Sequence, residues 1–292
     1  MGPVLFIIYT ASLWNGLENS IVAYADDTTL FSPILSPNHR VLVSESINRD
    51  LERIYSWCCT WGMLINPNKS QSVIFGRSRL IQPLHPPLVI NNISIETTNK
   101  LSLLGVLFDI KLTFETHIRN TVSSIAYKTG LLRKCYKNFS ESDTVLKTFY
   151  AFILPFYEYC SMVWSSSADT HLRLLDRSVG HIKFLLPNFN IDLEHRRNVA
   201  ALSFLFKIIN NQKHPLRSLL PAPYHSVRNT RFSSSQHSLS FSFIRFNTTQ
   251  FSRSFILKYT TVWNTLPEYV VQSSDVTTFK KQINNFLKAQ SI

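Results

Sequence analysis

The chain has 292 residues, of which 45% are hydrophobic and only 7 are glycine. This length is enough for two compact domains with a sizeable core, and the composition argues against a disordered chain, a collagen-like chain and a glycine-rich nucleotide-binding loop. The apolar run at residues 2–14 is shorter than the ~20 residues that a membrane-spanning helix needs, so we expect no membrane partner.

Charge is distributed unevenly along the sequence. Up to residue 170 there are 14 Lys+Arg and 13 Asp+Glu, a net charge of +1, whereas residues 171–292 have 16 against 5, a net charge of +11. This asymmetry predicts a polyanionic partner for the C-terminal part, and the interleaved Phe, Tyr and Trp residues favour nucleic acid. A merely basic surface that aids solubility is the alternative interpretation.

The cysteines show no zinc-binding spacing, and the nine histidines form no ligand cluster with them. We expect reduced thiols in the core of an intracellular protein, and the sequence does not distinguish the nucleus from the cytoplasm. The four cysteines are Cys58, Cys59, Cys135 and Cys160.

Two adjacent aspartates, Asp26 and Asp27, interrupt a strand-prone run, NSIVAYADDTTLF, at residues 19–31. Because both flanks favour strand and the Asp-Asp pair favours a tight turn, the pattern predicts a hairpin at 21–31 with two carboxylates at its tip. Carboxylates this close repel each other unless water or a cation offsets the repulsion. The pair is therefore either a solvated surface turn or part of a divalent-metal site. Residues 3–14 are expected to be the end of a buried helix.

A long helix is predicted over residues 37–61, after the hairpin. Ser36 can cap it, Pro37 fits its first position and Gly62 fits its end. Its apolar residues recur every three or four positions: Val43, Ile47, Leu51, Ile54, Cys58 and Trp61. Four of these are expected to pack on the apolar face of the hairpin: Ile47, Leu51, Ile54 and Trp61.

The aromatic residues Trp57 and Trp61 could stack on nucleic-acid bases, but their helical spacing favours packing in the core.

Short strands and then helices are predicted in the rest of the chain. The segment INPNKSQSVIFGRS predicts a turn followed by a short strand, and residues 85–109 predict two or three short strands. From about residue 115 the pattern is helical, residues 222–254 are Ser-rich and basic with little periodicity, and a final helix follows at 276–290. The predicted fold class is therefore α+β, with a mainly helical C-terminal part.

The sequence Tyr24-Ala25-Asp26-Asp27 resembles the aromatic-x-Asp-Asp hairpin that binds metal in reverse transcriptases. Further segments resemble this family in the expected order: GPVLFIIYTASL, LERIYSWCCTWGMLINPNKSQSVIFGRS, KLSLLGVLFDIKLTFETHI, AFILPFYEYCSMVW and FSRSFILKYTTVWNTLPEYVVQSSDVTTFKKQINNFL. Essentially the whole chain is similar to the C-terminal part of the reverse transcriptases of LINE-type, non-LTR retrotransposons.

The resemblance implies three regions. A partial palm with the Tyr-Ala-Asp-Asp hairpin would occupy residues 1–114, a helical, thumb-like region 115–221, and a basic, Ser-rich distal region with a terminal helix 222–292. It also implies RNA and DNA as partners, in the form of a template–primer duplex, with no small-molecule cofactor.

The same resemblance implies an RNA-directed DNA polymerase that uses Mg²⁺. Asp26 would be the main metal ligand and Asp27 the weaker or supporting one, so both are candidate catalytic residues. Tyr24 would lie under the primer terminus, and Lys69 would lie near the incoming triphosphate. For Lys69, a solvated lysine in a turn is an equal alternative.

The pattern departs from the family at one essential point. A two-ion site also requires an aspartate from an earlier strand, which the family places upstream of a position corresponding to Met1. Glu18, the only acidic residue before Asp26, falls too close to the hairpin to serve. We therefore expect a fragment whose upstream polymerase segment is missing and which is inactive alone.

The alternative function is a non-catalytic nucleic-acid-binding remnant that grips RNA or an RNA–DNA duplex. An unrelated α+β protein with a chance motif is a third hypothesis, which the ordered matches disfavour. Basic residues among aromatics are the expected phosphate contacts, with weak sequence preference. They are Arg196, Arg197, Arg228, Arg231, Arg245, Arg253, Lys280 and Lys281.

Overall fold

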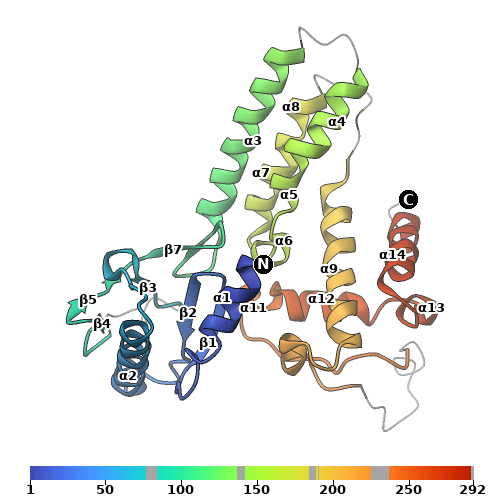
Figure 1. The fold of residues 1–292 in the computed structure, drawn as a ribbon. Helices are drawn as coiled ribbons and strands as arrows, with labels where there is room; N and C mark the ends of the chain where they lie inside the picture. Colours follow the sequence, from blue (N-terminus) through green and yellow to red (C-terminus); the bar gives the residue numbers. More distant parts are fainter. Residues whose placement is uncertain (77–83, 137–141, 184–188, 190, 225–236, 291–292) are drawn as a thin grey trace. The chain divides into compact units, whose positions relative to one another are not determined.

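The computed structural model describes residues 1–76, 84–136, 142–183, 189, 191–224 and 237–290 (Figure 1). It divides into two compact units, Met1–Leu112 and Thr113–Ile292. The first unit combines helices with small sheets and the second is mainly helical, in agreement with the α+β class predicted from the sequence.

The first unit has two α-helices and four two-stranded sheets among its described residues. Its elements are α1 (Gly2–Thr10), β1 (Ser20–Tyr24), β2 (Asp27–Phe31), α2 (His39–Thr60), the 3₁₀ turn η1 (Pro67–Lys69), β3 (Gln71–Ser72), β4 (Val89–Ile90), β5 (Ile93–Ser94), β6 (Glu96–Thr97), β7 (Lys100–Leu103) and β8 (Val106–Asp109). Strands β1–β2, β4–β5 and β7–β8 pair antiparallel, and β3 pairs parallel with β6.

Helix α1 is exposed, so the prediction of a buried helix there is wrong. Its side chains Val4, Leu5, Ile7 and Ile8 are between 57% and 67% exposed. The run is apolar on all sides, but only Thr10 of this helix is buried, so the rest of the chain covers a small part of its apolar surface. Among the described residues, no helix combines the length and the apolar character needed to cross a membrane.

Helix α2 begins two residues later than predicted, so Asn38 is its N-cap residue and Pro37 does not occupy its first position; its C-terminal end is as expected. The Ser36 hydroxyl accepts a hydrogen bond from the backbone N–H of His39 at 3.3 Å. At the other end Gly62 has a φ of +71°, and the N–H of Met63 donates to the carbonyl of Cys58 at 2.8 Å. This is the glycine-terminated end in which a left-handed residue satisfies a free helix carbonyl.

The core of the first unit is divided along α2. Ile54 is buried with Leu13 and Cys58, and Leu30 of β2 packs against that cluster. The prediction that Ile47 and Leu51 also pack on the hairpin is wrong. They pack against a second cluster made by residues of the β4–β5 segment, Leu88, Ile90 and Ile95. A helix rises about 1.5 Å per residue, so its apolar stripe is longer than one five-residue hairpin can cover.

Trp61 does not belong to the core as predicted. It lies just past the last residue of α2 and is 51% exposed. Among the cysteines, all four are free thiols, but only Cys58 is buried, whereas Cys59 and Cys135 are exposed. The expectation of core thiols is therefore correct for Cys58 alone.

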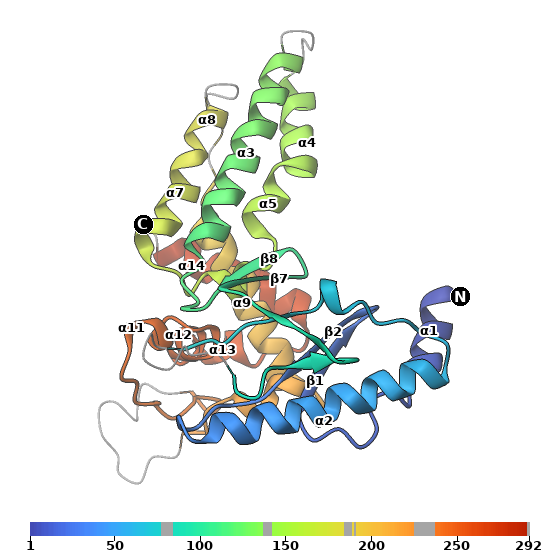
Figure 2. The same cartoon turned by 90° about the vertical axis from the view of Figure 1, so that its left-hand side faces the viewer.

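The second unit is built from helices, several of which run side by side in Figures 1 and 2. Its elements are α3 (Glu115–Tyr136), α4 (Ser142–Phe152), α5 (Leu154–Glu158), α6 (Ser161–Trp164), α7 (Asp169–Ser178), α8 (Gly180–Lys183), α9 (Leu193–Asn210), η3 (Pro215–Leu219), α11 (Thr249–Ser252), α12 (Phe255–Trp263), α13 (Glu268–Val271) and α14 (Val276–Gln290).

Aromatic rings form the centre of the C-terminal part of this unit. Trp263 and Phe279 are fully buried and stack with centroids 5.7 Å apart, and Phe206 stacks on Phe279 at 4.5 Å. The Trp263 indole N–H donates to the carbonyl of Leu239 at 3.0 Å, which ties the irregular segment before α11 to this core. Helices α9, α12 and α14 are thereby held together by one apolar cluster.

The start of α14 depends on the charge of Asp275. Its carboxylate accepts hydrogen bonds from the Thr278 hydroxyl at 2.6 Å and from the backbone N–H of Thr277 at 2.7 Å. The bond from the Thr278 side chain is the main cause that lowers the pKa of Asp275 to about 2. Because the folded-state pKa is depressed, this stabilisation is complete above the ordinary pKa of about 3.9 and is lost as the pH falls toward 2.

We expect wild-type protein to melt at a higher temperature than Asp275→Asn at pH 7, and the gap to close between pH 4 and pH 2. Asparagine can still cap the helix but carries no charge, so it isolates the ionised form. Thermal melts across this pH range measure the gap. A difference that stays constant down to pH 2 would contradict the assignment.

Candidate functional site

The two aspartates lie at the tip of the predicted hairpin, which is confirmed. In the register of β1 and β2, Tyr24 pairs with Asp27, so Ala25 and Asp26 form a two-residue loop. Ala25 has a φ of +53°. Positive φ at the first loop residue is typical of type II′ hairpin turns, where glycine is preferred, and it costs a residue with a Cβ about 1–2 kcal/mol. The tip is thus a tight and strained turn.

The tip is open to solvent in the structure. Asp26 and Asp27 are exposed, and Tyr24 is 67% exposed. The opposite side of the hairpin is partly covered, because Leu30 packs on the α2 cluster. The hairpin therefore presents its two carboxylates and its tyrosine on a surface that its own unit does not cover.

Two carboxylates alone do not make a complete two-ion site. Mg²⁺ takes oxygen ligands in near-octahedral geometry, and two ions about 4 Å apart need carboxylates that bridge them. Within the described ranges, no group of three or more His, Cys, Asp or Glu side chains could hold a metal ion. The described residues therefore do not fit the complete two-ion site that the resemblance implies.

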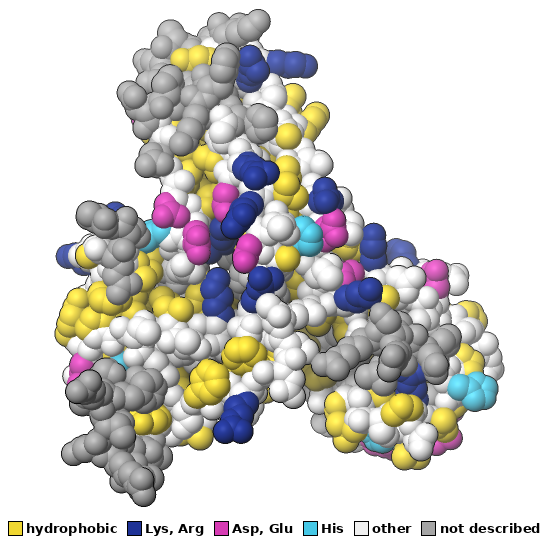
Figure 3. All heavy atoms as spheres, turned by 180° about the vertical axis from the view of Figure 1, so that it is seen from behind, with side chains coloured by type: hydrophobic (Ala, Val, Ile, Leu, Met, Phe, Trp, Pro, Cys, Tyr) yellow, Lys and Arg dark blue, Asp and Glu magenta, His cyan; other side chains and the backbone are white. Residues whose placement is uncertain are grey.

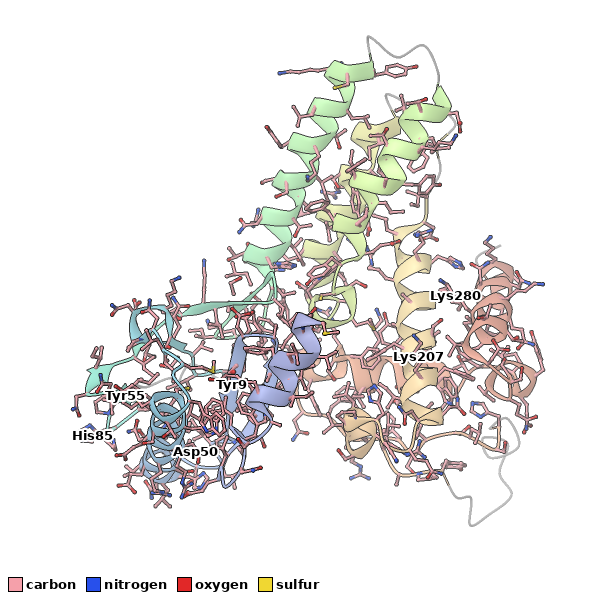
Figure 4. The ribbon with its side chains drawn as sticks, viewed as in Figure 1. Tyr9, Asp50, Tyr55, His85, Lys207 and Lys280 are labelled. Carbon is pink, nitrogen blue, oxygen red and sulfur yellow. The ribbon has the colours of Figure 1, made fainter. Side chains whose placement is uncertain are left out.

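A buried carboxylate, Asp50 of α2 (labelled in Figure 4), binds the residues just before the hairpin. Its side chain is fully buried and accepts hydrogen bonds from the backbone N–H groups of Glu18 and Asn19 at 2.9 Å and 2.8 Å. The Asn19 amide and the Arg53 guanidinium donate to the same carboxylate at 2.8 Å and 3.1 Å. Since β1 begins at Ser20, these bonds fix the point where the chain enters the hairpin.

Electrostatics favour the ionised form of this buried group. Burial alone raises the pKa of Asp50, but the hydrogen bonds from Glu18, Asn19 and Arg53 together lower it below its usual value. Beside it, the side-chain bond from Arg49 is the main cause that lowers the pKa of Glu18 to about 2, with Arg53 contributing further. The entry to the hairpin is thus a network of ionised groups.

Sequence reasoning missed Asp50, although a signal existed. Asp50 lies three residues after Ile47 and four before Ile54, so it shares the apolar stripe of α2. A carboxylate on a buried stripe needs partners, and here the partners are the backbone N–H groups that precede β1.

Lys69 and the tryptophans lie elsewhere in the first unit. Lys69 is the exposed last residue of η1. Trp57 and Trp61 stack with centroids 5.7 Å apart, and Tyr9 of α1 meets both rings edge-on at 5.9 Å. Trp57 also donates from its indole N–H to the Ser12 hydroxyl at 3.0 Å. Through these ring contacts Tyr9 (Figure 4) joins α1 to the C-terminal end of α2.

Three of the predicted phosphate-binding arginines form ion pairs within the second unit. Arg196 is paired with Glu158. Arg197, only 6% exposed, binds Asp176 at 3.0 Å, and Arg253 binds Asp169 at 3.2 Å. Each pair gives the guanidinium an internal carboxylate partner, so its charge is partly neutralised before any ligand arrives.

The other predicted contacts are more accessible. Arg245, Lys280 and Lys281 are exposed, and Lys280 lies on α14 (Figure 4). Arg228 and Arg231 lie outside the described residues. On the face seen in Figure 3, acidic and basic side chains are interspersed rather than gathered in one continuous basic patch. The assignments of all these residues to nucleic acid stay predictions.

Comparison with known proteins identifies what the chain is similar to. Residues 1–108 match the family described as "Reverse transcriptase (RNA-dependent DNA polymerase)". This match includes the hairpin, α2 and nearly all of the first unit. No solved structure matches the chain significantly.

Curated relatives come from mobile elements of flies. The chain is 27% identical over 184 residues to the RNA-directed DNA polymerase from mobile element jockey of Drosophila funebris, a match that covers 59% of this chain and 19% of the relative. It is 24% identical over 185 residues to the probable RNA-directed DNA polymerase from transposon X-element of Drosophila melanogaster, with the same coverage. The corresponding protein from transposon BS is 22% identical over 181 residues, covering 59% and 20%.

These matches confirm the resemblance to the reverse transcriptases of non-LTR retrotransposons over the part of the chain that they cover. The chain spans about a fifth of the length of the curated relatives. What those relatives do as whole proteins therefore carries over to this chain only as a proposal.

Proposed function

We propose that this chain is the C-terminal part of the palm and the following helical region of an RNA-directed DNA polymerase from a non-LTR retrotransposon, and that it has no polymerase activity alone. The observation that carries the proposal is the two-residue turn that places Asp26 and Asp27 at the tip of an exposed hairpin. The match of residues 1–108 to the reverse transcriptase family supports it.

The proposed roles are those that the resemblance to reverse transcriptases implies. Asp26 and Asp27 supply part of the oxygen ligands for Mg²⁺, and Tyr24, the strand residue before the turn, borders the primer terminus. Lys69 borders the incoming triphosphate. Asp50 is a positioning residue, because it acts on the hairpin through the backbone N–H groups of Glu18 and Asn19 and the side-chain amide of Asn19.

The number of candidate metal ligands among the described residues supports the proposed absence of activity. Nucleotidyl transfer needs one ion to activate the 3′-hydroxyl and another to steady the leaving pyrophosphate. Two carboxylates at one exposed tip hold an ion weakly, and they do not define a second position at the required separation.

We expect the purified chain to incorporate no nucleotide on a primed RNA template with Mg²⁺ or Mn²⁺, like its Asp26→Ala variant. Primer extension with labelled nucleotide measures this, and an active reverse transcriptase in the same buffer is the positive control. Template-dependent incorporation by the wild type that Asp26→Ala abolishes would overturn the proposal, since it would require a third carboxylate from another chain.

A second candidate function is binding of RNA or an RNA–DNA duplex without chemistry. The net charge of +11 in residues 171–292 favours it. This function does not depend on the metal site, so the chain can bind a template–primer duplex even where it does not copy one.

A further inference from the structure

The second unit contains a polar cavity of about 200 Å³ between α7, α9 and α12. Three cationic side chains line it, Arg173, Arg197 and Lys258. Three carboxylates, Asp169, Asp176 and Glu194, line it as well. The cavity is therefore rich in charge. Whether it favours an anion or a cation depends on which of these groups already have partners.

Arg197, which lines this cavity, has one buried donor without a partner in the described part of the chain. Arg197 is only 6% exposed, and its Nη2 binds Asp176 at 3.0 Å. Its Nη1 atom is buried and has no hydrogen-bond partner. A guanidinium N–H can only donate, and a buried donor left unpaired costs free energy, so this position calls for an acceptor.

A second cation lies close to Arg197. Burial is the main cause that lowers the pKa of Lys258; the nearby Glu194 carboxylate opposes this shift, and the positive charge of Arg197 lowers the pKa further. Among the described residues Lys258 and Arg173 form no ion pair with a carboxylate. Two cations that line one partly buried cavity are stabilised by one anion that they share.

The carboxylates that line the cavity do not cancel its preference for an anion. Asp176 is bound by Arg197, and Asp169 is bound by Arg253 at 3.2 Å. With Arg253 included, the cavity and its ion pairs contain four cationic and three anionic side chains. Glu194 is the one of these three carboxylates without an ion pair to these cations, so it is the group that repels a bound anion. A cation would instead leave the Nη1 donor of Arg197 unsatisfied.

We propose that this cavity binds a phosphate group, held by Nη1 of Arg197, the ammonium of Lys258 and the guanidinium of Arg173. A phosphate has several acceptor oxygens and enough charge to bridge donors from three helices. The inference goes beyond the proposed function, because a phosphate can bind here whether or not the chain copies or grips RNA. Its source is either a free phosphate or the backbone of a nucleic acid.

The test is titration calorimetry of the whole chain with inorganic phosphate, at constant ionic strength set with chloride. We expect saturable binding that weakens at least tenfold in Lys258→Gln and in Arg173→Gln. Lys207→Gln on α9 and Arg177→Gln on α7 remove the same charge outside the cavity and should change the affinity less than twofold. Lys258→Gln removes a partly buried charge, so it should not impair folding, which thermal melting checks.

A second arm distinguishes the sources. If phosphate raises the apparent Kd of a labelled RNA oligonucleotide at constant ionic strength, the cavity holds a backbone phosphate. If the two ligands bind independently, it holds a free phosphate. The proposed site would be overturned if phosphate produced no more heat than added chloride does. Equal phosphate affinity in wild type and Lys258→Gln would also overturn it. Loss of RNA binding with phosphate binding retained would contradict only the proposed nucleic-acid function.

Discussion

Replacing Asp50 by alanine is expected to lower the free energy of unfolding of the first unit by about 3 kcal/mol, because a buried donor left without its partner costs about 1–3 kcal/mol. The variant would leave the N–H groups of Glu18 and Asn19 without the acceptor that they have in the structure. Urea unfolding measures the loss. Hydrogen exchange of the backbone amides at residues 18–24 should accelerate, because the entry to β1 is released.

Glu52→Ala is the matched control for this prediction. Glu52 is an exposed carboxylate on the same helix, so its removal should change stability by less than about 0.5 kcal/mol. The loss of stability in Asp50→Asn should lie between those of Asp50→Ala and Glu52→Ala, since an amide offers one acceptor oxygen instead of two. Unchanged exchange at residues 18–24 in Asp50→Ala would show that the hairpin does not depend on this carboxylate.

The contribution of Asp50 to the free energy of unfolding should also depend on pH. Its folded-state pKa is lowered, so its contribution is complete above the ordinary value of about 3.9 and is lost as the pH falls below that value. The difference between wild type and Asp50→Ala should therefore narrow in acid.

The features that the sequence predicts well are those that rest on local chemistry. The hairpin needs only its own flanks and a tight turn, and Gly62 needs only the end of a helix, so both are confirmed. The partners of the α2 stripe depend on which segments return to it. Ile47 and Leu51 therefore pack against β4–β5 residues that no local pattern points to.

The partners of the charged residues could not be predicted from local patterns either. Arg196 and Arg197 are adjacent and look alike in the sequence, but Arg197 continues the buried stripe of α9 between Leu193 and Ala201. Position on the helix thus predicts which arginine is buried. Its partner Asp176 lies on another helix, α7, so the ion pair could not be predicted from local spacing.

This difference decides which basic residues test nucleic-acid binding cleanly. Alanine at Arg196 and Arg197 together would break two ion pairs, and the loss of buried Arg197 would leave Asp176 without its partner. Weaker RNA binding by that variant would mix lost contacts with lost stability. Lys280 and Lys281 are exposed on α14, so their removal alters charge with little effect on folding.

We therefore expect Lys280→Ala with Lys281→Ala to weaken RNA binding about tenfold and to make the slope of log K against log salt shallower by about 1.4, if each lysine touches one phosphate of a single strand. Fluorescence anisotropy of a labelled RNA, titrated at several salt concentrations, gives both values. Lys207→Ala with Lys213→Ala removes the same charge from exposed positions outside the predicted set. If both double variants change the slope equally, the positive charge attracts RNA non-specifically, and the RNA backbone does not bind along α14.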